Sequence, residues 1–292
     1  MHADLDTLLI AVYCAACSVF PADPTPRRGR PQKISDNELL CLMVAQMLLQ
    51  CPSDRVFLRR ARRRLGHLFP YLPSQPRYNE RCRALVPKLL LLWKALAAET
   101  LGTLDSVRLL DTTPVPCGQS IKTTRTSELA PWAGFGYCPA HSRRYWGFKL
   151  VLLCAPDGTV CDFDLVAANA PEREAALAVL EANPIQGATL ICDKGFAGRD
   201  FEAAVRELRA LLLRPSRSDE HDRPNPPIGP IRQRIESIIN TLKDQLLLER
   251  HGARTPAALL ARVTARILAL CACINLNQRL GLTGRELVPY AD

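Results

Sequence analysis

The sequence predicts a mixed α/β domain preceded by an all-helical region. Up to about residue 105, apolar residues recur at three- and four-residue steps between proline-rich breaks, which is typical of amphipathic helices. From Val107 onward, short apolar runs of strand length alternate with helical patterns, an order typical of mixed α/β folds. The chain has 292 residues, of which 48% are hydrophobic, so it can bury a substantial core.

The net charge of +9 is concentrated in one segment. Residues 27–83 contain thirteen Lys+Arg and four Asp+Glu, which leaves the rest of the chain about neutral. A concentrated basic segment indicates a polyanion partner, most often nucleic acid. Residues 1–7 carry two acids and no Lys or Arg, and no apolar run reaches about 18 residues. We therefore expect a cytoplasmic protein with no signal peptide and no membrane span.

The first predicted helix, Asp4–Phe20, is short and apolar. Residues 21–33 are basic and rich in proline, so they cannot continue the helix and are predicted to form an exposed connector. Within this connector, Arg28-Gly29-Arg30-Pro31 resembles the core of an AT-hook, whose arginines enter a narrow minor groove of DNA. A basic linker without that role is the alternative.

Two further helices follow the connector. A capping box formed by Ser35 and Glu38 begins the first, which extends to about Gln50. The second begins near Asp54 and carries five arginines in six positions. We expect these to contact DNA phosphates, because so much like charge is costly unless a polyanion neutralises it; a solvated charged face is the alternative. The five are Arg59, Arg60, Arg62, Arg63 and Arg64.

The last helix of this region is predicted over Tyr78–Thr100, with a kink at Pro87. Residues 1–105 are therefore predicted to be a basic, all-helical DNA-binding region with helix-turn-helix character. The pattern does not single out a recognition helix.

The pattern changes at Val107–Asp111, a short apolar strand that ends in an acid. Residues 112–144 then form a long irregular excursion in which prolines, basic residues and aromatic residues are interspersed. Such a mixture suits contact with nucleic acid ends or splayed bases. An aromatic cluster that merely packs the loop is the alternative.

The remaining elements alternate. Two strands around a Pro-Asp-Gly turn form a hairpin, and a helix then begins at Pro171. We assign the next acids, Glu172 and Glu174, to the positive N-terminal end of that helix. In order, the other predicted elements are the hairpin strands Tyr145–Cys154 and Thr159–Ala168, the strand Thr189–Cys192, the helix Arg199–Leu208 and the strand Leu211–Leu213.

Ile231–Arg250 is predicted to be one amphipathic helix, because its apolar residues form a single stripe. A final helix, capped by Thr255, runs to about Leu280. The stripe consists of Ile231, Ile235, Ile238, Leu242 and Leu246.

Three antiparallel strands followed by alternating helices and strands is the order of the ribonuclease H-like topology. We therefore predict a ribonuclease H-like, mixed-sheet catalytic domain at residues 106–253. Residues 254–292 are predicted to form a C-terminal helix that packs on this domain.

Three carboxylates stand out in the predicted catalytic domain. Asp111 and Asp193 each follow an apolar strand, and Glu236 lies on the long helix between Arg232 and Lys243. A lone acid between two cations is usually part of a solvated salt-bridge ladder. Here, however, three carboxylates come from two strand ends and one helix. This arrangement suits a divalent-metal site, because Mg²⁺ takes oxygen ligands.

These residues carry a resemblance to the DDE catalytic core of bacterial insertion-sequence transposases. The motifs are Leu110–Val115, Cys192–Phe196 and the helix with Glu236. The spacing Arg232-x3-Glu236-x6-Lys243 is similar to the helix signature of the IS4-like superfamily. That signature also has a Tyr three residues before the Arg, where this chain has Gly229. The resemblance extends over most of the chain.

The resemblance implies a transposase that binds the ends of its element, cleaves DNA and joins 3′-hydroxyl ends to target DNA. It implies two Mg²⁺ ions, with Mn²⁺ as a substitute, held by Asp111, Asp193 and Glu236. Two such ions neutralise the phosphodiester, activate the nucleophile and steady the leaving oxygen. Lys194, Arg232 and Lys243 would contact DNA phosphates. The implied assembly is a homodimer or higher oligomer on double-stranded DNA at the bacterial nucleoid.

Two other interpretations stay open at this point. A catalytically inactive or regulatory DNA-binding protein derived from a transposase would be favoured by loss of an acid, but all three acids are present. A plain metal-dependent nuclease would need the same acids and would differ in forming no joined products.

Overall fold

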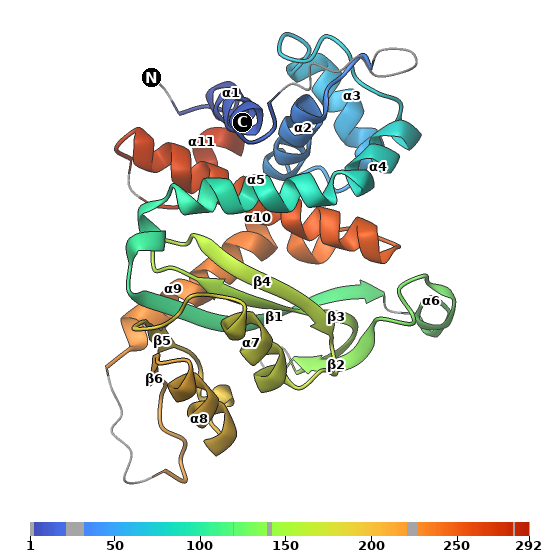
Figure 1. The fold of residues 1–292 in the computed structure, drawn as a ribbon. Coiled ribbons are helices and arrows are strands. Elements are labelled where there is room, and N and C mark those ends of the chain that lie inside the picture. The colour runs from blue at the N-terminus through green and yellow to red at the C-terminus, as the bar shows by residue number, and fades with distance from the viewer. Residues whose placement is uncertain are drawn as a thin grey trace. The chain divides into compact units, whose positions relative to one another are not determined.

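A computed structural model describes residues 3–21, 32–118, 120–138, 142–220, 227–282 and 284–291. The chain divides into two compact units (Figure 1). Unit 1 comprises residues 1–100 and 242–292, and unit 2 comprises residues 101–241. Arg28 and Arg30 lie outside the described residues.

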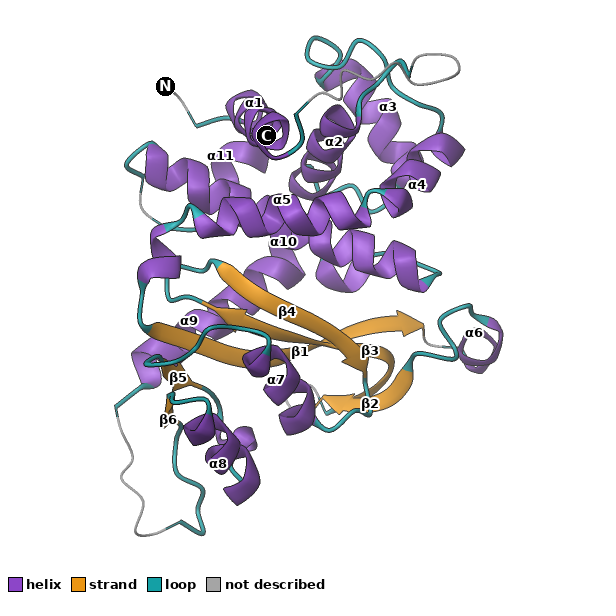
Figure 2. Cartoon of the chain, in the orientation of Figure 1, coloured by secondary structure: helices purple, strands orange, loops and turns teal. Residues whose placement is uncertain are grey.

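Unit 1 consists of helices (Figure 2). The capping box that begins the second helix is confirmed, because the backbone N–H of Ser35 donates to Glu38 Oε2 at 2.6 Å and that of Glu38 donates to Ser35 Oγ at 3.1 Å. The helices are α1 (Leu5–Val19), α2 (Asp36–Leu48), α3 (Asp54–Arg64), α4 (Gln75–Ala84), α5 (Val86–Ala98), α10 (Pro256–Arg279) and α11 (Val288–Ala291).

The helix predicted over Tyr78–Thr100 is in fact two helices, α4 and α5, with Leu85 between them. Pro87 lies in the first turn of α5 and does not kink a continuous helix. The reason is that a proline has no N–H to donate and fits best in the first turn, where that N–H has no helical partner.

Helix α10 is the apolar centre of unit 1. It packs against α5 and α2, and it is the one described helix long and apolar enough to cross a membrane. However, 78% of its most apolar window is buried inside the protein, which is typical of a core helix. Residues 254–292, which we predicted to form a separate C-terminal helix that packs on the catalytic domain, belong to the compact unit 1. The physical reason is that α10 buries apolar residues on all its sides and needs helices around it.

Unit 2 is built on one mixed sheet. The strand order is β4–β3–β1–β5–β6, with β2 also paired to β3. Strands β1, β3 and β4 are antiparallel, and β5 and β6 are parallel to β1. The strands are β1 (Val107–Gly118), β2 (Gly134–Cys138), β3 (Arg143–Cys154), β4 (Val160–Ala167), β5 (Thr189–Ile191) and β6 (Leu211–Leu213).

This topology confirms the predicted α/β fold, because three antiparallel strands precede two parallel strands that are each reached through a helix. Helix α7 lies on one face of the sheet and α9 on the other (Figure 2). The helices of unit 2 are α6 (Ile121–Thr126), α7 (Glu172–Glu181), α8 (Arg199–Glu207) and α9 (Gly229–Asn240).

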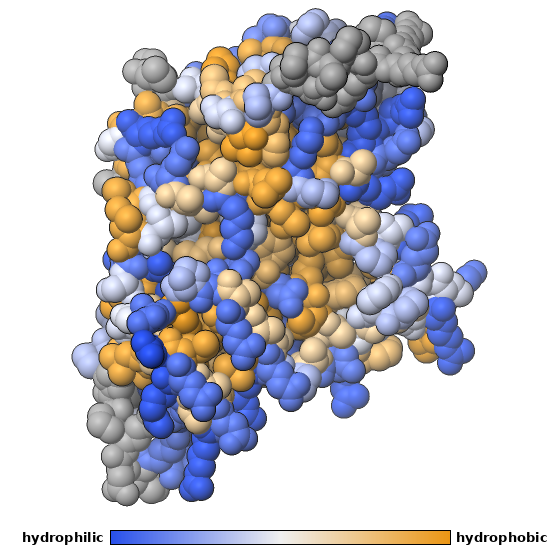
Figure 3. Space-filling view, in the orientation of Figure 1, coloured by the Kyte–Doolittle hydropathy of each residue, from blue (hydrophilic) through white to orange (hydrophobic). Residues whose placement is uncertain are grey.

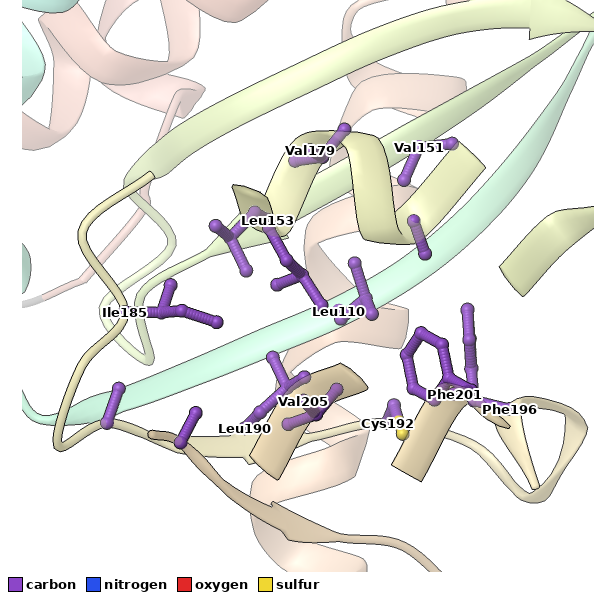
Figure 4. Close-up of a cluster of buried hydrophobic side chains, with 14 of the residues drawn as sticks. Leu110, Val151, Leu153, Val179, Ile185, Leu190, Cys192, Phe196, Phe201 and Val205 are labelled. Carbon is purple, nitrogen blue, oxygen red and sulfur yellow. The ribbon is translucent and has the colours of Figure 1, made fainter. Parts of the chain in front are cut away.

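The core of unit 2 lies between the sheet and helices α7 and α8 (Figure 4). Leu110 of β1, Leu153 of β3 and Leu190 of β5 project from the sheet into this cluster. Val179 of α7 and Val205 of α8 meet them from the helices. Because side chains alternate along a strand, the neighbours of these sheet residues face the opposite side, where α9 lies.

The excursion predicted as irregular over residues 112–144 is more ordered than expected. Strand β1 continues to Gly118 and pairs with β3, and α6 and β2 follow it. Beyond Leu109, β1 is paired only with β3, and its other edge has no partner strand. Pro114 and Pro116, which have no N–H to donate, are tolerated in a strand with such a free edge.

The predicted helix Ile231–Arg250 ends earlier than expected. Helix α9 stops at Asn240, a π-helical turn covers Thr241–Gln245, and Leu247 adopts a left-handed conformation with φ of 53°. Buried Arg266 satisfies the carbonyls at the break: Nε donates to Leu246 O at 2.7 Å and an Nη donates to Leu247 O at 3.1 Å. The apolar stripe alone did not reveal this break, because most of its residues are buried as predicted.

Candidate active site

The sheet register brings two of the predicted acids together. Leu109 of β1 and Ile191 of β5 are paired in parallel, and Asp111 and Asp193 each lie two residues further along. The residues just before the acids, Leu110 and Cys192, belong to the core on the α7 and α8 side. By alternation, Asp111 and Asp193 lie on the face covered by α9.

Helix α9 delivers the third acid to this face. Ile235 and Ile238 bury its apolar side, and α9 contacts β1. The Arg232 guanidinium joins two carboxylates: one Nη lies 2.6 Å from Asp193 Oδ1 and the other lies 3.2 Å from Glu236 Oε1. One arginine therefore spans the strand end and the helix.

The carboxyl of Asp111 lies among other acids. Its pKa is raised from 3.8 to about 7, chiefly by burial and in addition by the negative charges of Glu172, Asp193 and Glu236. The backbone N–H of Thr112, 2.7 Å from Asp111 Oδ1, acts in the opposite direction. A cluster of acids that repel one another is stable only when cations or protons compensate the charge.

Glu172 is a fourth acid close to Asp111, on the α7 side of the sheet, and the sequence did not reveal it. It is the first residue of α7 and accepts a hydrogen bond from the Thr112 hydroxyl. A side-chain carbon built on Gly195 would lie 3.7 Å from Glu172 Oε2, so this carboxylate also faces the loop after Asp193. Glu172 lies in the first turn of α7, as predicted, and its carboxylate also reaches Thr112 of β1. No spacing in the sequence signals it, because the contact depends on how α7 crosses the sheet.

The donor chemistry of the site fits a hard divalent cation. The carboxylates of Asp111, Asp193 and Glu236 offer only oxygen atoms, which suit Mg²⁺ or Mn²⁺ better than zinc. Among the residues that the structure describes, no three His, Cys, Asp or Glu side chains are close enough to hold a metal ion as they stand. Arg232 occupies oxygens of Asp193 and Glu236, so a metal ion and these two ion pairs would compete.

Lys194 and Lys243 are the other two basic residues that we predicted to contact DNA near the acids, and in the described part of the chain neither forms an ion pair with Asp193 or Glu236. Lys194 is exposed beside Asp193, and its backbone carbonyl accepts a hydrogen bond from Arg217 Nε at 3.3 Å. Lys243 belongs to unit 1, where its Nζ lies 3.7 Å from Glu249 Oε1. Contact of Lys194, Arg232 or Lys243 with phosphates stays a prediction.

The arginines of α3 form a single exposed surface in unit 1. Phe57 and Ala61 bury the opposite side of the helix. Arg60 donates to Leu49 O at 3.1 Å, so it also stabilises the preceding turn. Arg59, Arg60, Arg63 and Arg64 line a shallow hollow of about 590 Å³.

Comparisons with known proteins show which family model matches the chain. A family model described as "Transposase DDE domain" matches residues 102–275, more than half of the chain. A search of curated proteins finds no match. Among solved structures, the chain is similar to a piggyBac transposase synaptic complex with hairpin DNA, with 10% identity and a TM-score of 0.47. That alignment covers 98% of this chain and 78% of the other, but so distant a likeness identifies no function.

Proposed function

This chain belongs to the family of transposases with a DDE domain, and on that premise we propose that it moves an insertion sequence. It binds the ends of the element, cleaves DNA phosphodiesters and joins the 3′-hydroxyl ends to target DNA. The observation that carries the proposal is the guanidinium of Arg232, which contacts both Asp193 and Glu236, two acids whose charges both act on the carboxyl of Asp111.

Asp111 is the central ligand in the proposed mechanism. Together with Asp193 and Glu236, it would hold the Mg²⁺ or Mn²⁺ ions, which we propose to be two. Bound ions would neutralise the phosphodiester, activate the attacking oxygen and stabilise the leaving oxygen. The raised pKa of Asp111 supports this role, because a cluster of acids that repel one another gains most from a bound cation.

Arg232 changes partners in this proposal. In the structure, its guanidinium neutralises Asp193 and Glu236. With Asp193 and Glu236 holding metal ions, the guanidinium would be free to bind a DNA phosphate in a bidentate manner. Lys194 and Lys243 would hold neighbouring phosphates as point charges.

DNA recognition is assigned to unit 1. The exposed arginines of α3 would bind duplex phosphates, and Arg28 and Arg30 would enter the minor groove. Because two ends of an element must be processed together, we propose a homodimer or higher oligomer on DNA. The proposed setting is the cytoplasm of a bacterium, at the nucleoid.

The experiment that tests the catalytic role compares Glu236→Gln with wild type on labelled DNA that carries the element's ends. We expect cleavage to be lost and end binding to be nearly unchanged, since the amide keeps the shape of the side chain but cannot hold a metal ion as a carboxylate does. The matched control is Glu174→Gln, an exposed acid in the first turn of α7. Cleavage by Glu236→Gln at the wild-type rate would remove Glu236 from the proposed site.

A further inference from the structure

Unit 2 carries a surface that the proposed chemistry does not use. We call it the arm: it consists of α6, β2 and the start of β3, residues 120–138 and 143–146. Buried Leu129 and Trp146 anchor it. Asp111 lies near the start of β1, whereas the arm begins after Gly118, the last residue of that strand.

The arm exposes large apolar side chains that a monomer would normally bury. The exposed fractions are 72% for Ile121, 64% for Trp132, 66% for Phe135 and 57% for Tyr137. Figure 3 shows hydrophilic and hydrophobic side chains side by side over α6 and the adjoining strands. Exposed aromatic residues gathered in one segment mark an interaction surface more often than a neutral one.

The register of β2 and β3 places aromatic and basic side chains on the same face. Phe135 is opposite Trp146, and Tyr137 is opposite Arg144. Because paired residues and residues two apart on a strand share a face, Phe135 and Tyr137 of β2 lie on the same face as Arg144 and the buried Trp146 of β3. Beside these residues is a hollow of about 220 Å³. Its lining includes Gly118, Ile121, Phe135, Arg144, Tyr145 and Trp146.

The charge of the arm favours an anionic partner. Residues 120–146 contain Lys122, Arg125, Arg143 and Arg144 against a single acid, Glu128. A second copy of the chain that docked through the same surface would bring like charges together, because a two-fold interface presents each patch to itself. A protein partner would also meet more charge than the core of an interface usually contains.

We propose that the arm binds unpaired nucleotides of DNA, with Phe135 and Tyr137 stacking on bases and Arg144 contacting the phosphates between them. Aromatic side chains can stack on bases only where the bases are out of the duplex, whereas duplex phosphates need only cations. The surface therefore suits strands that are opened or frayed at a cleaved DNA end. This inference rests on the proposed function, since it specifies one form of its DNA substrate.

The test measures binding of the full chain to three fluorescein-labelled probes in the absence of divalent ions: a single-stranded 20-mer, the matching blunt duplex, and the duplex with a 5-nucleotide overhang. We expect the double variant Phe135→Ala and Tyr137→Ala to bind the single strand and the overhang at least about 30-fold more weakly, as expected when base stacking on two rings is removed. Binding to the blunt duplex should be nearly unchanged. Phe135→Trp should bind like wild type.

The control is Tyr71→Ala, which removes a partly exposed aromatic residue of unit 1 and should change none of the three affinities. Equal losses on the blunt duplex and the single strand, or no loss on either, would overturn the inference. A change in oligomeric state of the double variant in sedimentation, with unchanged DNA binding, would assign the arm to self-association and also overturn it. Failure of wild type to bind any probe would instead refute the proposed function itself.

Discussion

Asn in place of Asp111 should stabilise the metal-free protein, and the gain should depend on pH. The carboxyl pKa rises from 3.8 to about 7 in the folded protein, mainly because of burial and then because of the charges of Glu172, Asp193 and Glu236. A shift of about 3 units corresponds to about 4 kcal/mol, at 1.36 kcal/mol per unit. We treat this as an upper bound, since partial solvent access to the site weakens it.

The sign follows from proton binding. Because the folded state binds the proton of Asp111 more tightly than the unfolded state, this group destabilises the fold once it ionises. The penalty is absent below about pH 4, grows as the pH rises from about 4 to 7, and is fully present above pH 7. Asp111→Asn removes it, because the amide stays uncharged at every pH.

The assay is urea unfolding of wild type and Asp111→Asn in EDTA at a series of pH values from 4 to 8. The two proteins should have nearly equal unfolding free energies at pH 4, and the variant should be more stable at pH 8. Asp164→Asn, an exposed acid on β4, is the control and should show no such pH-dependent gain. Mg²⁺ should stabilise wild type and leave Asp111→Asn unchanged. If the variant were no more stable than wild type at pH 8, the described charge cluster would be refuted.

Two further predictions concern unit 1. The first variant replaces Arg59, Arg63 and Arg64 of α3 by Gln and keeps Arg60, which bonds Leu49 O. The slope of the logarithm of the DNA-binding constant against the logarithm of the salt concentration should become less steep, by about 0.9 for each DNA phosphate that the variant no longer neutralises. The same slope in wild type and the triple variant would contradict phosphate contact by α3, and Arg77→Gln serves as the exposed control. Arg266→Met should destabilise the protein by about 2–4 kcal/mol in urea unfolding, because it leaves the Leu246 and Leu247 carbonyls without their donor. Exposed Arg254→Met should change stability by less than about 0.5 kcal/mol, and an equal effect of both variants would argue against the role of Arg266.

Much of the site was predictable because sheet geometry is regular. An acid that follows each of two adjacent parallel strands must lie near the other, and the apolar runs before Asp111 and Asp193 identified those strands. The four-residue step from Arg232 to Glu236 places both side chains on one side of the helix, and the structure contains their ion pair, the alternative to which we preferred a metal site.

What the sequence could not reveal depends on tertiary contacts. Glu172 comes close to Asp111 only because α7 crosses the sheet where Thr112 can donate to it. The break at Leu247 is stabilised by Arg266, which is nineteen residues later and has no local signature. The grouping of α10 with the N-terminal helices reflects which surfaces it buries, and an apolar helix does not specify its neighbours in sequence. The arm formed a strand in place of a loop because β3 offered a free edge to pair with.

The most direct measurement of the central claim is a strand-transfer assay. It would combine the purified chain with labelled DNA that carries the element's own ends and with unlabelled target DNA, in Mg²⁺, in Mn²⁺ and in EDTA. We predict joined products with either metal ion, none in EDTA and none from Asp193→Asn. Cleavage without joined products would make the protein a nuclease. Tight binding of the ends with no cleavage in either metal ion would make it an inactive or regulatory DNA-binding protein and contradict the account.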